Sequence, residues 1–164
     1  MKTLNQYIQE KLIINKDYSD KMIVVKSFDE LRKIIEDRYD KLGAGTEHDP
    51  IDFNDIDVSN LDSFCNDNDK GIFEKTKFKY IDISSWDVSN VTNMTRMFCW
   101  CKELESIGDI SKWDVSKVNS MIHMFFDCKK FNQDISNWDV SNVMGRVGMF
   151  YGCPIKNEYE PKFK

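Results

Sequence analysis

One sequence unit is written three times between residues 81 and 153, and this repetition limits what the chain can fold into. Its tryptophan recurs at steps of 27 and then 25 residues, as Trp86, Trp113 and Trp138. The three copies read DISSWDVSNV, DISKWDVSKV and DISNWDVSNV, and they begin at Asp82, Asp109 and Asp134. Self-similarity at such a period is typical of proteins built from stacked units, each of which buries its apolar side chains against its neighbours.

Each copy holds a pattern for two short elements. The Ile–Ser–x–Trp–Asp–Val stretch alternates apolar and polar residues, which predicts a half-buried strand. The methionines and phenylalanines that follow are spaced i, i+3, i+4, which predicts a short helix with a narrow apolar face. Ser89, Ser116 and Ser141 stand where such a helix would take its N-cap. The aspartates Asp87, Asp114 and Asp139 would repel one another in a stack, so we predict that each accepts backbone amides.

The full unit D-I-S-x-W-D-V-S-N-V-x-x-M-x-x-M-F-x-x-C resembles the BspA-like leucine-rich repeat family of bacterial surface proteins. The resemblance covers about half of the chain. It implies a solenoid with one short strand and one short helix per repeat, used for adhesion or protein binding. It does not imply an enzyme.

We therefore expect an α/β repeat fold, a short leucine-rich-repeat-like solenoid with parallel short strands and an N-terminal helix–strand–helix cap. The cap rests on a predicted helix at residues 3–11, a strand at 21–26, and a helix that a Ser27–Glu30 capping box opens and Gly43 ends. The expected domains are a cap at 1–45, a solenoid at 46–153 and a tail at 154–164. The solenoid divides into a degenerate repeat at 51–80 and repeats at 81–107, 108–132 and 133–153.

Composition argues against several classes of partner. The net charge is −5 and the 23 basic residues are scattered, so nucleic acid is not expected as a partner. No run of about 18 apolar residues exists, and we expect no membrane span. The N-terminus has charges where a secretion signal needs its apolar region, so we expect a cytoplasmic protein. The odd cysteine count of five fits a reducing compartment, with Cys101, Cys128 and Cys153 as small buried residues rather than bridges.

No set of residues has the spacing of a catalytic or metal site. His48 and His123 are the two histidines, and neither has a partner motif for nucleophilic catalysis. Cys99 and Cys101 lack a second Cys/His pair at zinc spacing. The run at residues 66–71 lacks the ligands of an EF-hand, although weak cation binding by this acidic region stays open. We predict no catalytic residue, cofactor or metal.

Repeat scaffolds place specificity at the positions that vary between units. Trp100, Phe126 and Tyr151 follow the Met–Phe pair and are larger and more apolar than a solvated position requires. The alternative is that these aromatic side chains pack under the loop to the next unit. A second candidate surface includes Lys112, at a variable position of the strand face. The predicted partner-binding residues are Trp100, Phe126, Tyr151, Arg96, His123 and Lys112.

The function predicted from these features is a non-catalytic protein–protein interaction module. One alternative is a phage-encoded inhibitor or accessory protein that binds a host factor in the host cytoplasm, because residues 2–17 are similar to N-terminal leaders of bacteriophage proteins. The acidic stretch at residues 47–69, with eight acids and no Lys or Arg, could then engage a basic surface. Another alternative is adhesion at a cell surface, as the resemblance implies. Self-association through the ends of the stack stays open.

Overall fold

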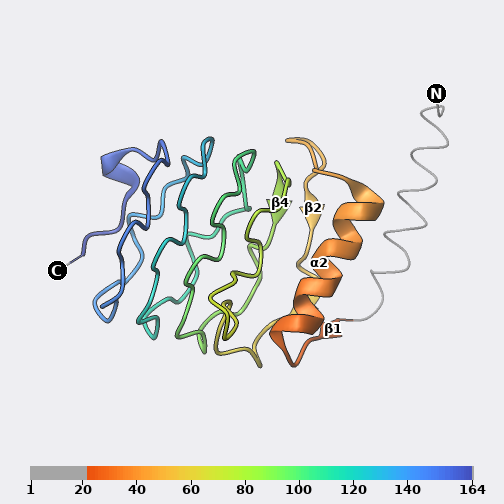
Figure 1. Cartoon of the computed structure of the whole chain (residues 1–164), viewed down its shortest axis with the longest axis horizontal. Helices are drawn as coiled ribbons and strands as arrows, with labels where there is room; N and C mark the ends of the chain where they lie inside the picture. The colour runs from red at the N-terminus through yellow and green to blue at the C-terminus, as the bar shows by residue number, and fades with distance from the viewer. Residues whose placement is uncertain (1–21, 164) are drawn as a thin grey trace.

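The structure, a computed structural model, describes residues 22–163. Its elements in chain order are β1 (Ile23–Val24), α2 (Phe28–Leu42), β2 (Ile51–Asp52), β3 (Ile56–Asp57), β4 (Ile81–Asp82) and the 3-10 helix η1 (Asn157–Tyr159). Strand β1 pairs in parallel with β3, and β2 pairs in parallel with β4. Figure 1 shows α2 at one end and backbone loops side by side from there to the C terminus. The helix expected at residues 3–11 lies outside the described residues.

Helix α2 begins and ends at the residues that its sequence predicts. The Ser27 hydroxyl oxygen accepts the Glu30 amide at 3.2 Å, which satisfies one of the free amides of the first turn. At the other end the Gly43 amide donates to the Tyr39 carbonyl at 2.8 Å. Leu31 and Ile35 are fully buried, so one face of the helix covers the end of the core. None of the helices described here is both long and apolar enough to cross a membrane.

Each copy of the repeated unit, together with its Met–Phe segment, forms one layer: residues 82–101, 109–128 and 134–153. Neighbouring layers run in parallel and join at single bridging residues rather than along strands. One series of parallel bridges connects Ser63, Asn93, Ser120 and Gly145 in that order. The apolar side chains inside the layers form one core, in which the rings of Phe73, Phe98, Phe125 and Phe150 stack at 5.3, 5.4 and 5.8 Å between centroids.

The prediction of an α/β leucine-rich-repeat-like solenoid, with a strand and a helix in each repeat, is wrong. Within residues 22–163, α2 is the only α-helix, and the four strands are two residues long and form two sheets of two strands. The Met–Phe segments are not helical because their amides alternate between two acceptors. The Met97 amide donates to the Met94 carbonyl at 3.2 Å, while the Phe98 amide donates to Met124 of the next layer at 2.9 Å. An α-helix would direct both amides to carbonyls four residues back.

The predicted helix–strand–helix cap is wrong as well. Strand β1 does not belong to a separate cap, because Ile23 pairs with Ile56 of β3 and joins the stretch that follows α2. The predicted helix N-caps are also wrong, since no helix follows them. The Ser89 amide instead donates to the Asp87 carboxylate two residues earlier, at 3.0 Å, in a tight turn.

The prediction that the stacked aspartates accept backbone amides is confirmed. Hydrogen bonds from the side chain and backbone of Ser89 hold the pKa of Asp87 below its ordinary value. The Asp114 carboxyl has a lowered pKa for the same reason, through Ser116. In each layer the amide of a serine donates to the carboxylate, at 3.0 Å for the pairs Ser89–Asp87, Ser116–Asp114 and Ser141–Asp139. The turn thereby offsets the repulsion between layers.

The tryptophans stack for one pair of layers. Trp113 and Trp138 lie 6.1 Å apart with their rings nearly parallel, and the Trp138 indole N–H donates to the Ile110 carbonyl at 3.0 Å. Trp86 stacks on Phe73 at 5.9 Å instead, and no ring contact joins it to Trp113 in the described part of the chain. The buried indole nitrogen of Trp113 has no hydrogen-bond acceptor among residues 22–163.

The cysteines form no disulfide, as predicted, and all five are free thiols. In each layer one thiol donates to the carbonyl of a phenylalanine that precedes the layer in the chain. These pairs are Cys101 to Phe73 at 3.0 Å, Cys128 to Phe98 at 2.9 Å and Cys153 to Phe131 at 3.4 Å. Burial raises the pKa of Cys101 to about 12, so this thiol stays protonated and serves as a hydrogen-bond donor.

Candidate functional site

Three aromatic side chains from successive layers form a continuous surface, which we call the aromatic ridge: Trp100, Phe126 and Tyr151. The centroids of Trp100 and Phe126 lie 5.4 Å apart, and those of Phe126 and Tyr151 lie 5.0 Å apart with an interplanar angle of 18°. Trp100 keeps 37% of its surface exposed and Tyr151 keeps 69%. The structure thus brings together three of the predicted partner-binding residues, and two of them, Trp100 and Tyr151, are exposed.

Hydrogen bonds between layers place these rings. The Trp100 amide donates to the Phe126 carbonyl at 2.8 Å, and the Asp127 amide donates to the Tyr151 carbonyl at 2.7 Å. Trp100 has a left-handed backbone with φ of 64°, which is unusual for a bulky residue. The residue before it, Cys99, is buried, and the left-handed turn lets Trp100 reach the ridge from one position further along the chain. Such local strain is kept only where surrounding contacts hold it.

Two predicted residues lie in different settings. The His123 ring packs edge-on against Phe126 with centroids 5.1 Å apart, so His123 belongs to the border of the ridge. Arg96 instead forms an ion pair with the buried Glu74, at 2.8 Å from Nη2 to Oε1. Burial opposes ionisation of Glu74, but hydrogen bonds from Arg96 and the Gly71 amide outweigh it and hold its pKa below the ordinary value. Arg96 therefore stabilises the first layers.

Lysines border the ridge at the Trp100 end. The Lys102 ammonium lies 5.0 Å from the Trp100 ring centroid, and it lies 3.7 Å from the Asp127 carboxylate. Lys129 also pairs with Asp127. A cation over an aromatic face is favourable and keeps the ring in a defined position. The ridge therefore combines apolar rings with a basic border.

Lys112 lies apart from the ridge. It is exposed, and among the described residues no ring contact, hydrogen bond or ion pair connects it with Trp100, Phe126 or Tyr151. Its neighbour Ser111 lines a separate hollow of about 710 Å³ between two layers. The structure therefore does not join Lys112 with the other predicted residues.

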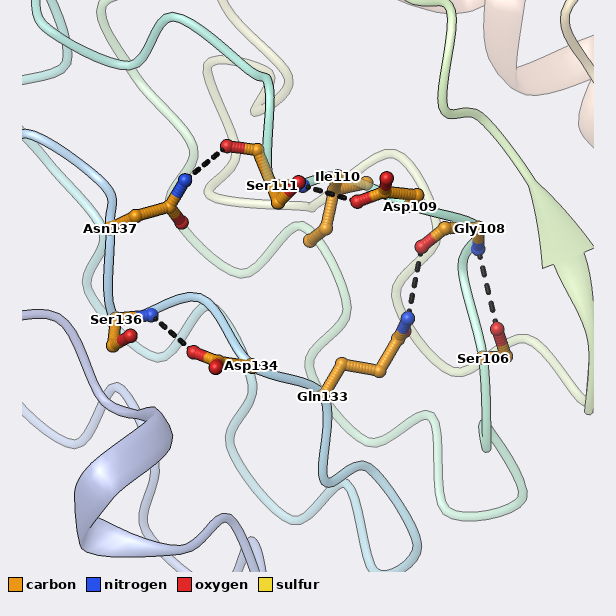
Figure 2. A pocket seen from close by; sticks show the side chains of 9 residues that line it. All are labelled: Ser106, Gly108, Asp109, Ile110, Ser111, Gln133, Asp134, Ser136 and Asn137. Atoms are coloured by element: carbon orange, nitrogen blue, oxygen red, sulfur yellow. Dashed lines mark hydrogen bonds between the residues drawn. The ribbon is translucent and has the colours of Figure 1, made fainter.

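This hollow exists because one repeat is two residues shorter than the repeat before it. Here the side chain of Gln133 replaces the backbone groups that would otherwise connect the two layers by hydrogen bonds. Its Oε1 accepts the Ile107 amide and its Nε2 donates to the Gly108 carbonyl, both at 2.9 Å. Figure 2 shows this amide spanning toward Gly108, with the turns of Asp109 and Asp134 on the other sides.

The two carboxylates of the hollow are already used by their own turns. The pKa of Asp109 is lowered by hydrogen bonds from Ser111, and that of Asp134 by hydrogen bonds from Ser136. Both groups therefore stay ionised near neutral pH and cannot serve as proton donors. Among the residues that the structure describes, no group of three or more His, Cys, Asp or Glu could hold a metal ion. The hollow is polar and open, and it lies where the backbone hydrogen bonds between the two layers are interrupted.

Comparison with known proteins identifies a family. The family described as "Mycoplasma protein of unknown function, DUF285" matches residues 52–161. The chain belongs to this family. The region shared with DUF285 begins within β2 and ends after η1, so it includes all three layers and the whole aromatic ridge. No curated protein and no solved structure matches the chain.

Sequence reasoning missed two contributors to these surfaces. Lys102 follows Trp100 by two residues, and only the stacked structure shows that its ammonium returns over the ring. Gln133 carried a usable signal, because it lies between Trp113 and Trp138, where the tryptophan spacing shortens from 27 to 25 residues. A shorter repeat must leave backbone groups without their usual partners, and a side-chain amide is suited to replace one peptide group.

Proposed function

We propose that the chain is a non-catalytic module that binds another protein through the aromatic ridge. The observation that carries this proposal is the stack of Trp100, Phe126 and Tyr151 on the surface, where two of the three rings remain substantially exposed. Exposed aromatic residues are costly to leave in water and are enriched among the residues that dominate binding energy.

The ridge is also arranged in advance. Its rings are fixed by contacts with one another and by backbone hydrogen bonds between layers, so little side-chain freedom remains to be lost on binding. The basic border at Lys102 would suit a partner with an apolar contact patch and an acidic border. The resemblance of the repeated unit to BspA-like repeats, which are used for protein binding, supports the same proposal.

A quantitative capture experiment tests the proposal. The immobilised full chain would be incubated with a cell lysate, and the proteins that it captures would be identified. The same is done with the Trp100→Ala/Phe126→Ala double variant and with Val24→Ala as a control. Val24 is an apolar residue, 51% exposed, in β1 at the opposite end of the stack. We expect a protein bound in stoichiometric amounts by the wild type and by the control to be lost from the double variant.

Thermal melts of the three proteins check that the double variant is folded at the capture temperature. If it is not, Trp100→Ala alone replaces it, because Trp100 is the more exposed ring of the two. A captured set that is the same for wild type and ridge variant would refute binding through the ridge.

A further inference from the structure

Along the Met–Phe segments, on the ridge side, the backbone hydrogen bonds between layers point in one direction, whereas just before these segments the amides of Asn119 and Met144 donate back to Thr92 and Asn119 of the layer before. Amides of one layer donate to carbonyl oxygens of the next, and the carbonyl groups that accept face back toward the N-terminal end. The pairs between the first two layers are Arg96 to Ile122, Phe98 to Met124 and Trp100 to Phe126, at 2.9, 2.9 and 2.8 Å. The pairs between the next two are His123 to Val147, Phe125 to Met149 and Asp127 to Tyr151, at 3.0, 2.9 and 2.7 Å. A stack of this kind ends with carbonyl groups at one face and amides at the other.

The carbonyl face is closed by the protein itself. The outermost acceptors on this face are the carbonyl oxygens of Ile72 and Glu74. The amide that follows each of them in the chain already donates to the first layer. The guanidinium of Arg32, on α2, donates to both, at 2.7 Å and 3.4 Å. Helix α2 therefore satisfies this end of the ladder, as the cover of a stack must do.

The amide face stays open on the ridge side. The amides of Gly148, Phe150 and Gly152 stand where His123, Phe125 and Asp127 stand one layer earlier, and none of the three has an acceptor among residues 22–163. The C-terminal tail pairs with the other side, where the Ile135 amide donates to the Tyr159 carbonyl at 3.0 Å. We call the three unpaired amides the open edge.

The open edge is bare of side chains at two of its three positions. Gly148 of the last layer stands where the earlier layers have Arg96 and His123. Gly152 stands where they have Trp100 and Asp127. All of these residues have left-handed backbones. A Cβ at Gly148 would lie 2.5 Å from the His123 ring and one at Gly152 would lie 2.9 Å from the Asp127 carboxylate, so side chains of the previous layer fill the space beside both glycines. The three unpaired amides define an edge for a chain that brings carbonyl oxygens.

We infer that the open edge binds an extended, acidic segment of the partner protein, which adds its backbone carbonyl oxygens as the next rung of the ladder. This inference rests on the proposed function and names the part of the partner that is recognised. Unpaired amides of an edge accept an added chain through main-chain hydrogen bonds. An aromatic side chain of the segment would continue the ridge beyond Tyr151, whose ring is 69% exposed.

Charge selects the kind of segment. From residue 140 to residue 155, Arg146 is the one residue of the Asp, Glu, Lys and Arg types, and it is exposed. Its guanidinium lies over the Phe163 ring at 4.8 Å, beside the open edge. A second copy of this chain, stacked head to tail, cannot offer carbonyl oxygens to these amides. Its own Arg32 already donates to the carbonyl groups at its N-terminal face. An acidic extended segment satisfies both the amides and the Arg146 cation.

Amide NMR on the isotope-labelled full chain tests this inference. The probe is the synthetic peptide acetyl-Asp-Val-Tyr-Val-Asp-Val-amide, and its control has Lys in place of both Asp. We expect saturable shifts of the amides of Gly148, Phe150 and Gly152, with a dissociation constant of about 1 mM or below and at least tenfold slower hydrogen exchange. The amides of Phe98 and Trp100, which already have acceptors, should not shift.

The variant Arg146→Glu should weaken binding of the acidic peptide at least fivefold and leave the lysine peptide no weaker than before. The experiment on the wild type needs no variant, so a failure to fold cannot obscure it. The inference is wrong if none of the three amides shows a saturable shift. It is also wrong if raising the protein concentration alone produces the same shifts, because that result would indicate self-association. Failure of the proposed function is seen separately, as capture that does not depend on Trp100 and Phe126.

Discussion

Replacement of Gln133 by Ala is expected to destabilise the protein by about 2–3 kcal/mol, because two hydrogen bonds are lost and a buried amide keeps no partner. The Ile107 amide that Gln133 satisfies belongs to a residue with no exposed surface, so its pairing depends on the Gln133 side chain. The second lost bond is the one from Nε2 to the Gly108 carbonyl. With a urea dependence of about 2 kcal/mol per molar, the midpoint of unfolding should fall by roughly 1 M.

A matched control comes from another amide of the same hollow. The Asn137 side chain donates to the Ser111 carbonyl at 2.6 Å, but Asn137 is exposed and water can take its place. Asn137→Ala should therefore cost less than about 1 kcal/mol. A loss below about 0.5 kcal/mol for Gln133→Ala, or an equal loss for both variants, would refute the view that Gln133 replaces missing backbone.

The variant Gln133→Glu adds a test by pH. A carboxylate still accepts the Ile107 amide, but it faces the Gly108 carbonyl oxygen with a negative charge and no proton to donate. This setting should raise the pKa of the introduced group above its ordinary value. The variant should therefore be weakened most at pH 7, and the difference from wild type should shrink as pH falls through the raised pKa, since the protonated acid again donates. A difference that is constant between pH 7 and pH 4 would contradict this reasoning.

Three further predictions follow from single contacts. Trp138→Phe should cost about 1 kcal/mol more than Trp113→Phe in chemical denaturation, since only the Trp138 indole loses a hydrogen bond; equal costs would contradict this. Gly71→Ala should lower stability by about 3 kcal/mol or prevent folding, because an added Cβ would lie 1.9 Å from the Arg96 carbonyl oxygen; a normal thermal melt would refute it. The Cys128 thiol should resist alkylation by iodoacetamide at pH 8 until the protein unfolds, because burial raises its pKa, and mass spectrometry would detect any early reaction.

Local signals in the sequence predicted those features that depend on neighbouring residues. The Ser27–Glu30 capping box and Gly43 located both ends of α2, because capping is satisfied within a few residues. The aspartate turns were predicted for the same kind of reason, since carboxylate and amide lie two residues apart. The predicted helices at the Met–Phe segments failed because their i, i+3, i+4 spacing also suits a backbone that buries every apolar side chain by bonding to the next layer.

The candidate site was predicted in part. Trp100, Phe126 and Tyr151 stood out as large apolar residues at variable positions, and the structure joins them into one ridge. Their exposure could not be predicted, because it depends on where the left-handed turn at Trp100 directs the ring. Lys112 was grouped with them in the sequence, but its place on a different part of each layer separates it.

The sequence by itself determined the order and spacing of the layers, the buried apolar positions and helix α2, because these follow from residue type and short-range hydrogen bonding. Only the tertiary structure decided which acceptor each backbone amide takes. That choice depends on whether a carbonyl of the next layer lies within hydrogen-bond distance, and along the Met–Phe segments it replaces the expected helices with hydrogen bonds to the next layer. It also leaves the amides of Gly148, Phe150 and Gly152 unpaired within the described residues, beside the exposed ring of Tyr151.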